Sequence, residues 1–144
     1  MAYYAFAEAI LAGRPITLYD EGRLRRDFTY IDDIVAGVLA CLDRPPAPGK
    51  APLLFNIGNN RAEYVSDLVA LLERSLGRRA LIRNVTRPVS DVAETWADLT
   101  AIEAYAGYRP RTPLSEGVPR FVEWLLEYKR NELTLLLDAP GGRA

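Results

Sequence analysis

The spacing of apolar residues predicts a helix at the start of the chain. Over residues 2–12, apolar side chains recur at steps of three and four positions, which is the period of one helix face: Tyr3, Phe6, Ala7, Ile10 and Leu11. Gly13 and Pro15 then end the run. Because no Ser, Thr, Asp or Asn precedes it as a cap, two interpretations stay open: a frayed N-terminal helix, or a chain that begins inside a helix.

Two strands and a second helix are predicted next. Residues 16–19 and 27–31 have strand character, and a polar turn at 20–22 follows the first of them. Asp32 is placed to cap a helix whose inward face is expected to consist of Ile34, Val35, Val38, Leu39 and Leu42. Gly37 lies in the middle of this helix and costs about 1 kcal/mol relative to Ala, so we expect a neighbour to pack closely against it.

The middle of the chain continues the alternation of strands and helices. Residues 43–52 contain four prolines and predict a loop, and residues 53–57 predict a strand that is buried on both faces. Ser66 is expected to cap a helix that ends at Gly77, with Leu68, Val69, Leu72 and Leu76 facing inward. Residues 80–85 predict a further strand.

The last third predicts an irregular segment and two more helices. Residues 86–97 lack periodicity, and Asp98 is expected to cap a short helix that stops at Gly107. Thr112 is expected to cap the longest helix, with Pro113 at its first position and one apolar stripe along it: Leu114, Val118, Phe121, Val122 and Leu125. This order of elements predicts an α/β protein, or an α+β-like fragment, because the strands are too few and too short for a complete doubly wound sheet.

Composition excludes several classes of function. The chain has 18 Lys and Arg against 19 Asp and Glu, so no overall field attracts nucleic acid or a membrane surface. It contains no His, which excludes catalytic triads that use His and metal sites that have a His ligand. The single Cys41 lies in an apolar setting and is expected to be a buried, inert thiol. No apolar run approaches the ~20 residues of a membrane span, and no signal-peptide pattern opens the chain, so we expect a cytoplasmic protein.

Five segments carry a resemblance to one family. They are AILAGRPITLYDEG (9–22), RRDFTYIDDIVAGVLACLDRPP (25–46), LFNIGNNR (54–61), SDVAETWADLTAIEAYAGYRPRT (90–112) and PLSEGVPRFVEWLLEY (113–128). Together they resemble the C-terminal part of extended short-chain dehydrogenase/reductases that act on nucleotide sugars, in particular the UDP-glucuronate 4-epimerases. The resemblance implies a nucleotide-sugar-binding lobe over residues 1–130 that lacks most of the Rossmann sheet, followed by an apolar and then flexible tail over 131–144.

The residues missing from the family pattern affect the expected activity. Complete members use NAD, held by a glycine-rich loop, and a Tyr-xxx-Lys pair whose Tyr moves a sugar hydroxyl proton while the nicotinamide moves a hydride. The ten glycines here never have GxGxxG spacing, and the residues four places before Lys50 and Lys129 are Pro46 and Leu125. The resemblance therefore implies no catalytic residue and no cofactor site in this chain, although NAD serves the complete family enzyme.

The resemblance assigns nucleotide contacts to residues near the first two strands. Arg26 matches the Arg that binds the diphosphate in the family, a role that suits a guanidinium because its N–H groups can pair with phosphate oxygens. The alternative is a solvated basic turn, with Arg23 and Arg25 close by. Thr17 and Tyr19 match the segment that borders the nucleobase, where Tyr19 would stack on uracil. Its alternative is a half-buried strand tyrosine.

Three more residues of the candidate site lie in the irregular segment. Asp91 matches an acid that accepts hydrogen bonds from the ribose hydroxyls, against a solvated loop carboxylate. Arg87 lies near a second phosphate position, but RPVSD is one residue longer than the usual form, so a plain surface Arg stays open. Thr95 matches a family position that is threonine in glucuronate epimerases and aromatic in galactose epimerases. We expect the adjacent Trp96 to pack in the core or at its rim.

These observations predict the UDP-hexuronate or UDP-hexose binding portion of an NAD-dependent 4-epimerase that is inactive alone. Two alternatives stay open: a standalone interaction or oligomerisation module, whose apolar tail at 133–137 docks a partner, and the same lobe of a nucleotide-sugar dehydratase. The expected partners are a UDP-sugar and the NAD-binding lobe. Without that lobe, an apolar face with Val35, Val38, Leu39 and Phe55 is expected to be exposed and to drive self-association. The acidic pair Asp32/Asp33 is read as a cap and a favourable charge at a helix N-terminus.

Overall fold

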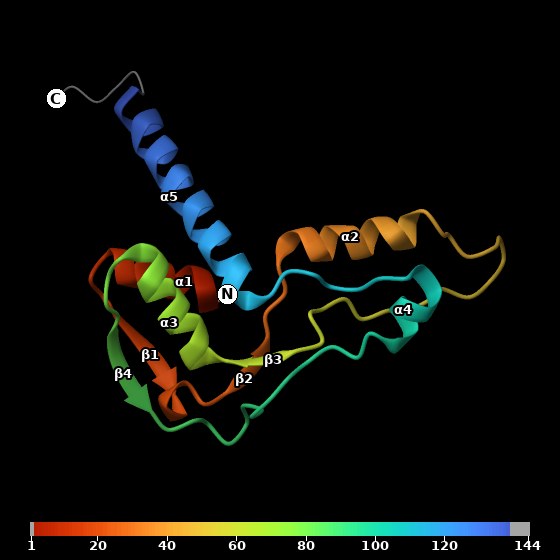
Figure 1. Ribbon diagram of the computed structural model, residues 1–144, viewed down its shortest axis with the longest axis horizontal. Coiled ribbons are helices and arrows are strands. Elements are labelled where there is room, and N and C mark those ends of the chain that lie inside the picture. The colour runs from red at the N-terminus through yellow and green to blue at the C-terminus, as the bar shows by residue number, and fades with distance from the viewer. Residues whose placement is uncertain (1, 139–144) are drawn as a thin grey trace.

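Three helices of the computed structural model pack against one another at one end of the molecule (Figure 1). The structure describes residues 2–138, with side chains through residue 132. The elements in chain order are α1 (Ala2–Leu11), β1 (Pro15–Tyr19), the 3-10 turn η1 (Asp20–Gly22), β2 (Arg25–Asp27), α2 (Ile31–Leu42), β3 (Ala62–Tyr64), α3 (Val65–Leu76), β4 (Leu81–Val85), α4 (Thr100–Ala106) and α5 (Leu114–Asp138). Within this described part, no helix is both long and apolar enough to span a bilayer.

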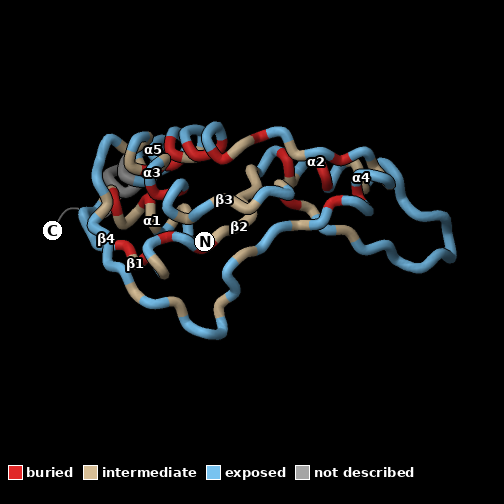
Figure 2. The backbone as a smooth tube through the Cα atoms, turned by 60° about the horizontal axis from the view of Figure 1, so that its bottom comes forward, coloured by how far each residue is buried: buried red, intermediate tan, exposed pale blue. Residues whose placement is uncertain are grey.

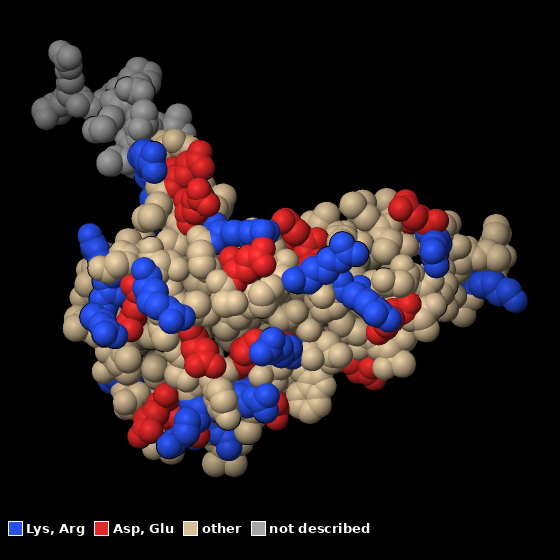
Figure 3. Space-filling model, in the orientation of Figure 1, with Lys and Arg blue, Asp and Glu red and all other residues tan. Residues whose placement is uncertain are grey.

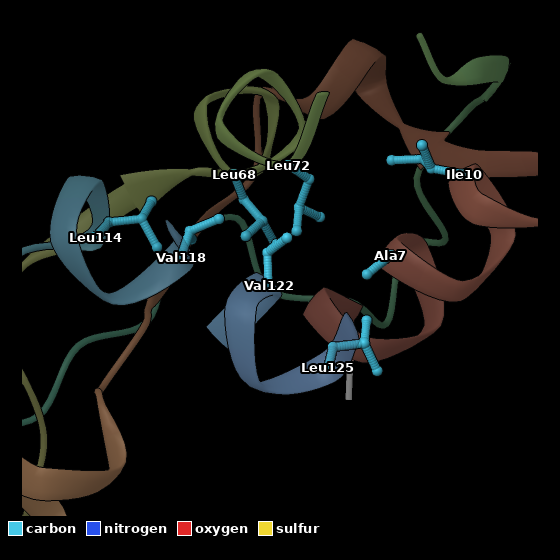
Figure 4. Packing of buried hydrophobic residues seen from close by; sticks show 8 residues of the cluster. All are labelled: Ala7, Ile10, Leu68, Leu72, Leu114, Val118, Val122 and Leu125. Carbon is cyan, nitrogen blue, oxygen red and sulfur yellow. The ribbon is translucent and has the colours of Figure 1, made fainter. Parts of the chain in front are cut away.

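The helical body consists of α1, β1, α3, β4 and α5. Its core is built from the periodic apolar positions that the sequence predicted, which point toward one another in Figure 4: Ala7, Ile10, Leu68, Leu72, Leu114, Val118, Val122 and Leu125. Burying one large apolar side chain stabilises a fold by about 1.5–3 kcal/mol, so this cluster is the main source of stability. At its rim, the Lys129 ammonium donates to the Glu8 carboxylate at 2.6 Å and joins α5 to α1.

Two short sheets connect this body to the candidate site. β1 pairs in parallel with β4, from Pro15↔Leu81 to Tyr19↔Val85. Ile16 and Leu18 point inward and pack with Val69 of α3, which leaves Thr17 and Tyr19 on the outward side of β1. β2 pairs antiparallel with β3.

The arm consists of α2, α4 and the loops 43–61 and 97–110, and it extends away from the helical body (Figure 1). A small core of Leu99, Ile102 and Tyr108 holds it together. Figure 2 shows much less buried backbone here than in the helical body. Gly37 is buried, and Ile57 and Tyr108 are the close neighbours that were predicted for it. A Cβ at this position would lie only 3.0 Å from Ile57 and 3.1 Å from Tyr108.

The apolar face of α2, which its period predicted to face inward, lies open instead, because α2 buries Asp33 and Gly37 on its other side. Val35, Val38 and Leu39 are 46%, 52% and 51% exposed, so the prediction that these side chains are exposed is confirmed. The expectation for Phe55 was wrong, because its ring is half-buried and packs against Tyr105 with 4.9 Å between centroids. Cys41 is half-buried beside the arm's core and not fully buried as predicted.

Three predicted helix caps were wrong. α2 begins at Ile31 and α3 at Val65, each after a Tyr that forms no side-chain cap bond, so Asp32 and Ser66 lie inside the first turn. Asp33, which was expected to act as a favourable charge at the helix N-terminus, also forms hydrogen bonds to another part of the chain. Its buried carboxylate accepts the N–H groups of Arg111 and Thr112 at 3.0 and 2.9 Å, which ties α2 to the start of α5.

The start of α5 also differs from the prediction. The Pro113 carbonyl accepts the first helical hydrogen bond, from Gly117 at 3.0 Å, so Pro113 occupies the cap position that was expected for Thr112. The Asp98 carboxylate does bond the first residue of α4, Thr100, through its N–H and hydroxyl. These two hydrogen bonds lower the pKa of Asp98.

The strand predictions were correct for β1 and β4 and wrong elsewhere. Residues 53–57 form no strand in the described part of the chain, where no neighbouring strand lies beside them. The second strand is Arg25–Asp27 and not 27–31, and β3 was not predicted. Gly77 and Gly107 end α3 and α4 in the left-handed conformation, as expected.

The backbone of α5 continues without a break through residue 130 to Asp138. The first part of the apolar and then flexible tail expected at 131–144 is therefore helical in its backbone, over residues 131–138. Residues 139–144, and the side chains of the segment 133–137 that was considered for partner docking, lie outside the described residues.

Candidate functional site

The candidate site lies where β2 runs beside residues 91–97. The Arg25 backbone N–H donates to the Ala93 carbonyl at 3.0 Å, and the Thr95 N–H donates to the Arg25 carbonyl at 3.2 Å. β3 flanks β2 on its other side. This arrangement brings Arg26 next to a segment that is 65 positions further along the chain.

Arg26 is fixed by three acceptors. Its Nη2 donates to Asp91 Oδ1 at 2.8 Å, while Nη1 donates to the Arg25 carbonyl at 2.8 Å and more weakly to the Ala93 carbonyl at 3.4 Å. Its side chain is only 25% exposed. The alternative of a freely solvated basic turn is therefore incorrect for Arg26. Within the described residues, two of its five N–H groups stay available for another acceptor.

Arg87 reaches the same segment from the other direction. Its Nη1 donates to the Asp91 carbonyl, and its Nε lies 3.4 Å from Asp20 Oδ2. The Arg87 backbone N–H also donates to Asp20 Oδ1 at 3.0 Å. The structure therefore links Asp20, Arg87, Asp91 and Arg26 in one chain of contacts, which joins the end of β1 to β2.

The other predicted residues lie around this chain of contacts. Thr17 and Tyr19 share the outward side of β1, where Thr17 Oγ1 accepts from Arg83 Nη2 at 3.2 Å and Tyr19 is 40% exposed. Among the described residues, no hydrogen bond or ion pair joins either side chain to Arg26. Thr95 is exposed, and so is Trp96, which was expected in the core or at its rim.

Two acids of this region were not predicted from the sequence. Asp20 pairs with Arg87, and Asp27 accepts backbone N–H groups from two loops. Asp20 stands directly after Tyr19 with a positive φ of 46°, a conformation that Asp tolerates in tight turns. The only signal in the sequence was their position beside candidate residues.

Tyr108 lies beside the Gly58 loop, which contacts Asp27. The Tyr108 hydroxyl donates to the Gly58 carbonyl at 2.9 Å. Burial, and then the nearby charges of Asp33 and Asp27, raise the pKa of Tyr108 to about 12. On the face drawn in Figure 3, acidic and basic side chains are interspersed over the whole surface, so the site's paired charges do not belong to a larger field of one sign.

The described residues do not fit NAD in the usual dinucleotide-binding mode. That mode needs a glycine-rich turn between a strand and a helix N-terminus, where the backbone approaches a pyrophosphate. Here β1 leads into η1, and a Cβ on Gly22 would lie 2.9 Å from the Ser66 backbone nitrogen. The close approach of this glycine therefore serves packing against α3, and we assign no step to NAD in this chain.

Comparisons with known proteins show similarity of sequence to one family. Residues 2–58 match the NAD dependent epimerase/dehydratase family. UDP-glucuronate 4-epimerase 4 of Arabidopsis thaliana is 40% identical over 89% of this chain and 32% of its own length. The probable UDP-glucuronate 4-epimerase of Rhizobium meliloti is 36% identical over 94% of this chain and 44% of its own length.

A solved structure extends the similarity to the fold. MoeE5, determined in complex with UDP-glucuronic acid and NAD, superimposes with a TM-score of 0.77 at 28% identity, covering 89% of this chain and 42% of MoeE5. The mixed α/β fold with few strands is confirmed by this match. The chain thus spans less than half the length of these relatives, and it is similar to one portion of proteins of the NAD dependent epimerase/dehydratase family.

Proposed function

We propose that this chain is the UDP-sugar-binding lobe of an NAD-dependent 4-epimerase, with a UDP-hexuronate or UDP-hexose as ligand. The chain alone is not catalytic in this proposal, because it lacks the Tyr-xxx-Lys pair and a dinucleotide cradle. The single observation that carries the proposal is the convergence of Arg26 and Arg87 on Asp91.

The geometry supports a role for Arg26 in binding the diphosphate. Its guanidinium is held by Asp91 and by two backbone carbonyls, so little side-chain entropy is lost when a phosphate binds. Two N–H groups remain for phosphate oxygens. Arg87, which Asp20 orients, supplies a second positive charge next to the same segment.

The remaining contacts extend along β1 and the 91–97 segment. Tyr19 offers an exposed ring for uracil, beside Thr17 on the same side of the strand. Asp91 accepts from Arg26 through Oδ1, which leaves Oδ2 to accept from the ribose hydroxyls, and Thr95 contacts the sugar. The UDP-glucuronic acid named for MoeE5 and the glucuronate 4-epimerase relatives support this ligand class.

The test is a titration with UDP, followed by calorimetry and by tryptophan fluorescence. Trp96 lies within the 91–97 segment, whereas Trp124 lies on α5, so the Trp124→Phe variant isolates the reporter at the site. We expect saturable binding. Arg26→Ala should weaken it about ten- to a hundred-fold, since a hydrogen bond to a charged group contributes roughly 1.5–3 kcal/mol.

Arg109→Ala is the matched control, because Arg109 also pairs with an acid but lies in the arm, beside Glu103 at 2.5 Å. Its affinity for UDP should equal that of the wild type. Absence of binding by the wild-type chain, or equal affinity in Arg26→Ala, would overturn the proposal and favour the interaction-module alternative.

We further propose that the open face of α2 packs against the NAD-binding part of such an enzyme. Val35, Val38 and Leu39 form an apolar stripe with Ile31 and Leu42, and all five are exposed. A stripe of this kind on one helix is typical of a surface that another element covers. On its own, the chain is expected to self-associate through this stripe.

Sedimentation velocity over a range of concentrations tests this surface. We expect the wild type to form larger species as concentration rises, and the double variant Val38→Glu/Leu39→Glu to stay monomeric. Val89→Glu is the control, since Val89 is a fully exposed apolar residue outside α2. A wild-type chain that stays a sharp monomer at high concentration contradicts the proposal.

A further inference from the structure

Asp27 has more hydrogen-bond partners than any other carboxylate in the described part of the candidate site. Its Oδ1 accepts the Asn59 N–H at 2.9 Å, and its Oδ2 accepts the N–H groups of Ala97 at 2.9 Å and of Asn60 at 3.1 Å. These three backbone donors belong to two loops, 32–33 and 70 positions away in the chain, and the Thr29 hydroxyl adds a longer hydrogen bond to Oδ1 at 3.5 Å. One side chain therefore joins three distant segments.

The hydrogen bond to Ala97 completes the attachment of the 91–97 segment to β2. The backbone of Arg25 binds Ala93 and Thr95, and the side chain of Arg26 binds Asp91. Asp27 holds the far end of the same segment. Consecutive residues of β2 thus attach the segment at its start, its middle and its end.

The junction around Asp27 is tightly packed. A Cβ on Gly58 would lie 2.5 Å from the Ala97 Cβ and 2.7 Å from Asp27 Oδ2. Neither distance is possible without a shift of the loops, so glycine at position 58 is what lets the two loops approach this carboxylate.

The chemistry requires a carboxylate at this position. The two oxygens of a carboxylate offer about four acceptor sites and no donor, whereas a side-chain amide offers one acceptor oxygen and an NH₂ donor group. In an Asp27→Asn variant, the NH₂ group would face at least one of the three backbone N–H donors.

We infer that Asp27 is a positioning residue of the nucleotide site: it holds the 91–97 segment on β2, so that Asp91 and Thr95 face the ligand beside Arg26. This inference rests on the proposed UDP-sugar function. Asp27 itself touches no ligand in this assignment and acts through the segment that it holds.

The experiment compares Asp27→Asn with Asp33→Asn by amide hydrogen exchange and by UDP titration of the full chain. Asp33 is a matched control, because its carboxylate also accepts two backbone N–H groups, but at Arg111 and Thr112. Asp27→Asn should speed exchange at Thr95 and Ala97 by about tenfold or more and should weaken UDP binding about tenfold. Asp33→Asn should speed exchange at 111 and 112 and leave UDP affinity unchanged.

A second variant, Gly58→Ala, disturbs the same junction without removing the carboxylate. It should also speed exchange at Ala97 and weaken UDP binding, and it decides the question if Asp27→Asn does not fold. Unchanged exchange at Thr95 and Ala97 in both variants overturns the inference, as does full UDP affinity with accelerated exchange. If the wild type binds no UDP, the proposed function and the ligand role of Asp27 fall together, while exchange still reports whether Asp27 holds the segment.

Discussion

The helical body and the arm are held together by different interactions. In the body, eight buried apolar residues from three helices form one continuous core. In the arm, only Leu99, Ile102 and Tyr108 form the buried centre, and the carboxylate of Asp33 anchors α2 from its buried side. Most of the apolar side chains of α2 face away from that centre.

The difference shows that a regular apolar pattern does not by itself define which side of a helix is buried in this chain. α3 buries Leu68, Val69 and Leu72, as its period predicts. α2 buries Asp33 and Gly37 instead. The polar links of the arm fix its geometry by direction and distance, whereas the core of the body stabilises it through the area that it removes from water.

The largest expected effect is in the helical body. Leu72 is fully buried, so Leu72→Ala should lower the free energy of unfolding by about 2–5 kcal/mol, because it removes apolar contacts and leaves a cavity. Urea denaturation followed by circular dichroism measures this change. Leu39→Ala is the control, since it makes the same substitution on the open face of α2, and at concentrations where the chain is monomeric it should stay within about 0.5 kcal/mol of the wild type. Equal losses in both variants would mean that α2 is covered in solution.

A smaller effect is expected from the polar links of the arm. Tyr108→Phe removes the hydrogen bond to the Gly58 carbonyl and should cost about 0.5–1.5 kcal/mol near neutral pH. Since the pKa of Tyr108 is raised to about 12 by burial and by two nearby acids, only the unfolded chain loses this proton between about pH 10 and 12. The wild type should therefore lose stability as pH rises through that window, by up to about 1.4 kcal/mol per pH unit.

The Phe variant lacks that proton, so the stability advantage of the wild type over the variant should shrink above pH 10 and change sign before pH 12, because about 2 kcal/mol is lost over this window. Urea denaturation at pH 8, 10 and 12 measures this difference. A difference that stays constant over the range would show that Tyr108 ionises with an ordinary pKa in the folded protein.

The sequence predicted the helical body well because local rules decide its structure. The periodic stripe of α5, the stop at Gly77 and the short strand at 16–19 each depend on residues within one or two turns. In the arm, the prediction of a strand at 53–57 was wrong, because a strand needs a partner and none lies beside it in the described chain. The starts of α2 and α3 were shifted because a Tyr in extended conformation precedes each helix without a side-chain cap.

The candidate site was predicted in part, and only through the family resemblance. Arg26, Arg87 and Asp91 were all singled out, and the structure places them in contact. Asp20 and Asp27 were missed because their partners lie 67 and 32–70 positions away, at distances where no local pattern reports a contact. The site roles of these residues stay predictions until UDP binding is measured.

The parallel pairing of β1 with β4 has a kinetic meaning. Thr17 and Arg83 face each other across 66 positions of chain, so the pair closes a long loop before its hydrogen bonds can form. Closing a loop of that length costs conformational entropy before the contacts of the strand pair can form. The contact of α1 with β1 needs no such loop, because only a tight turn separates the two elements. β4 should therefore join β1 only after the local contact of α1 with β1 has formed, and the end of β1 that carries Tyr19 takes its final form in that later step.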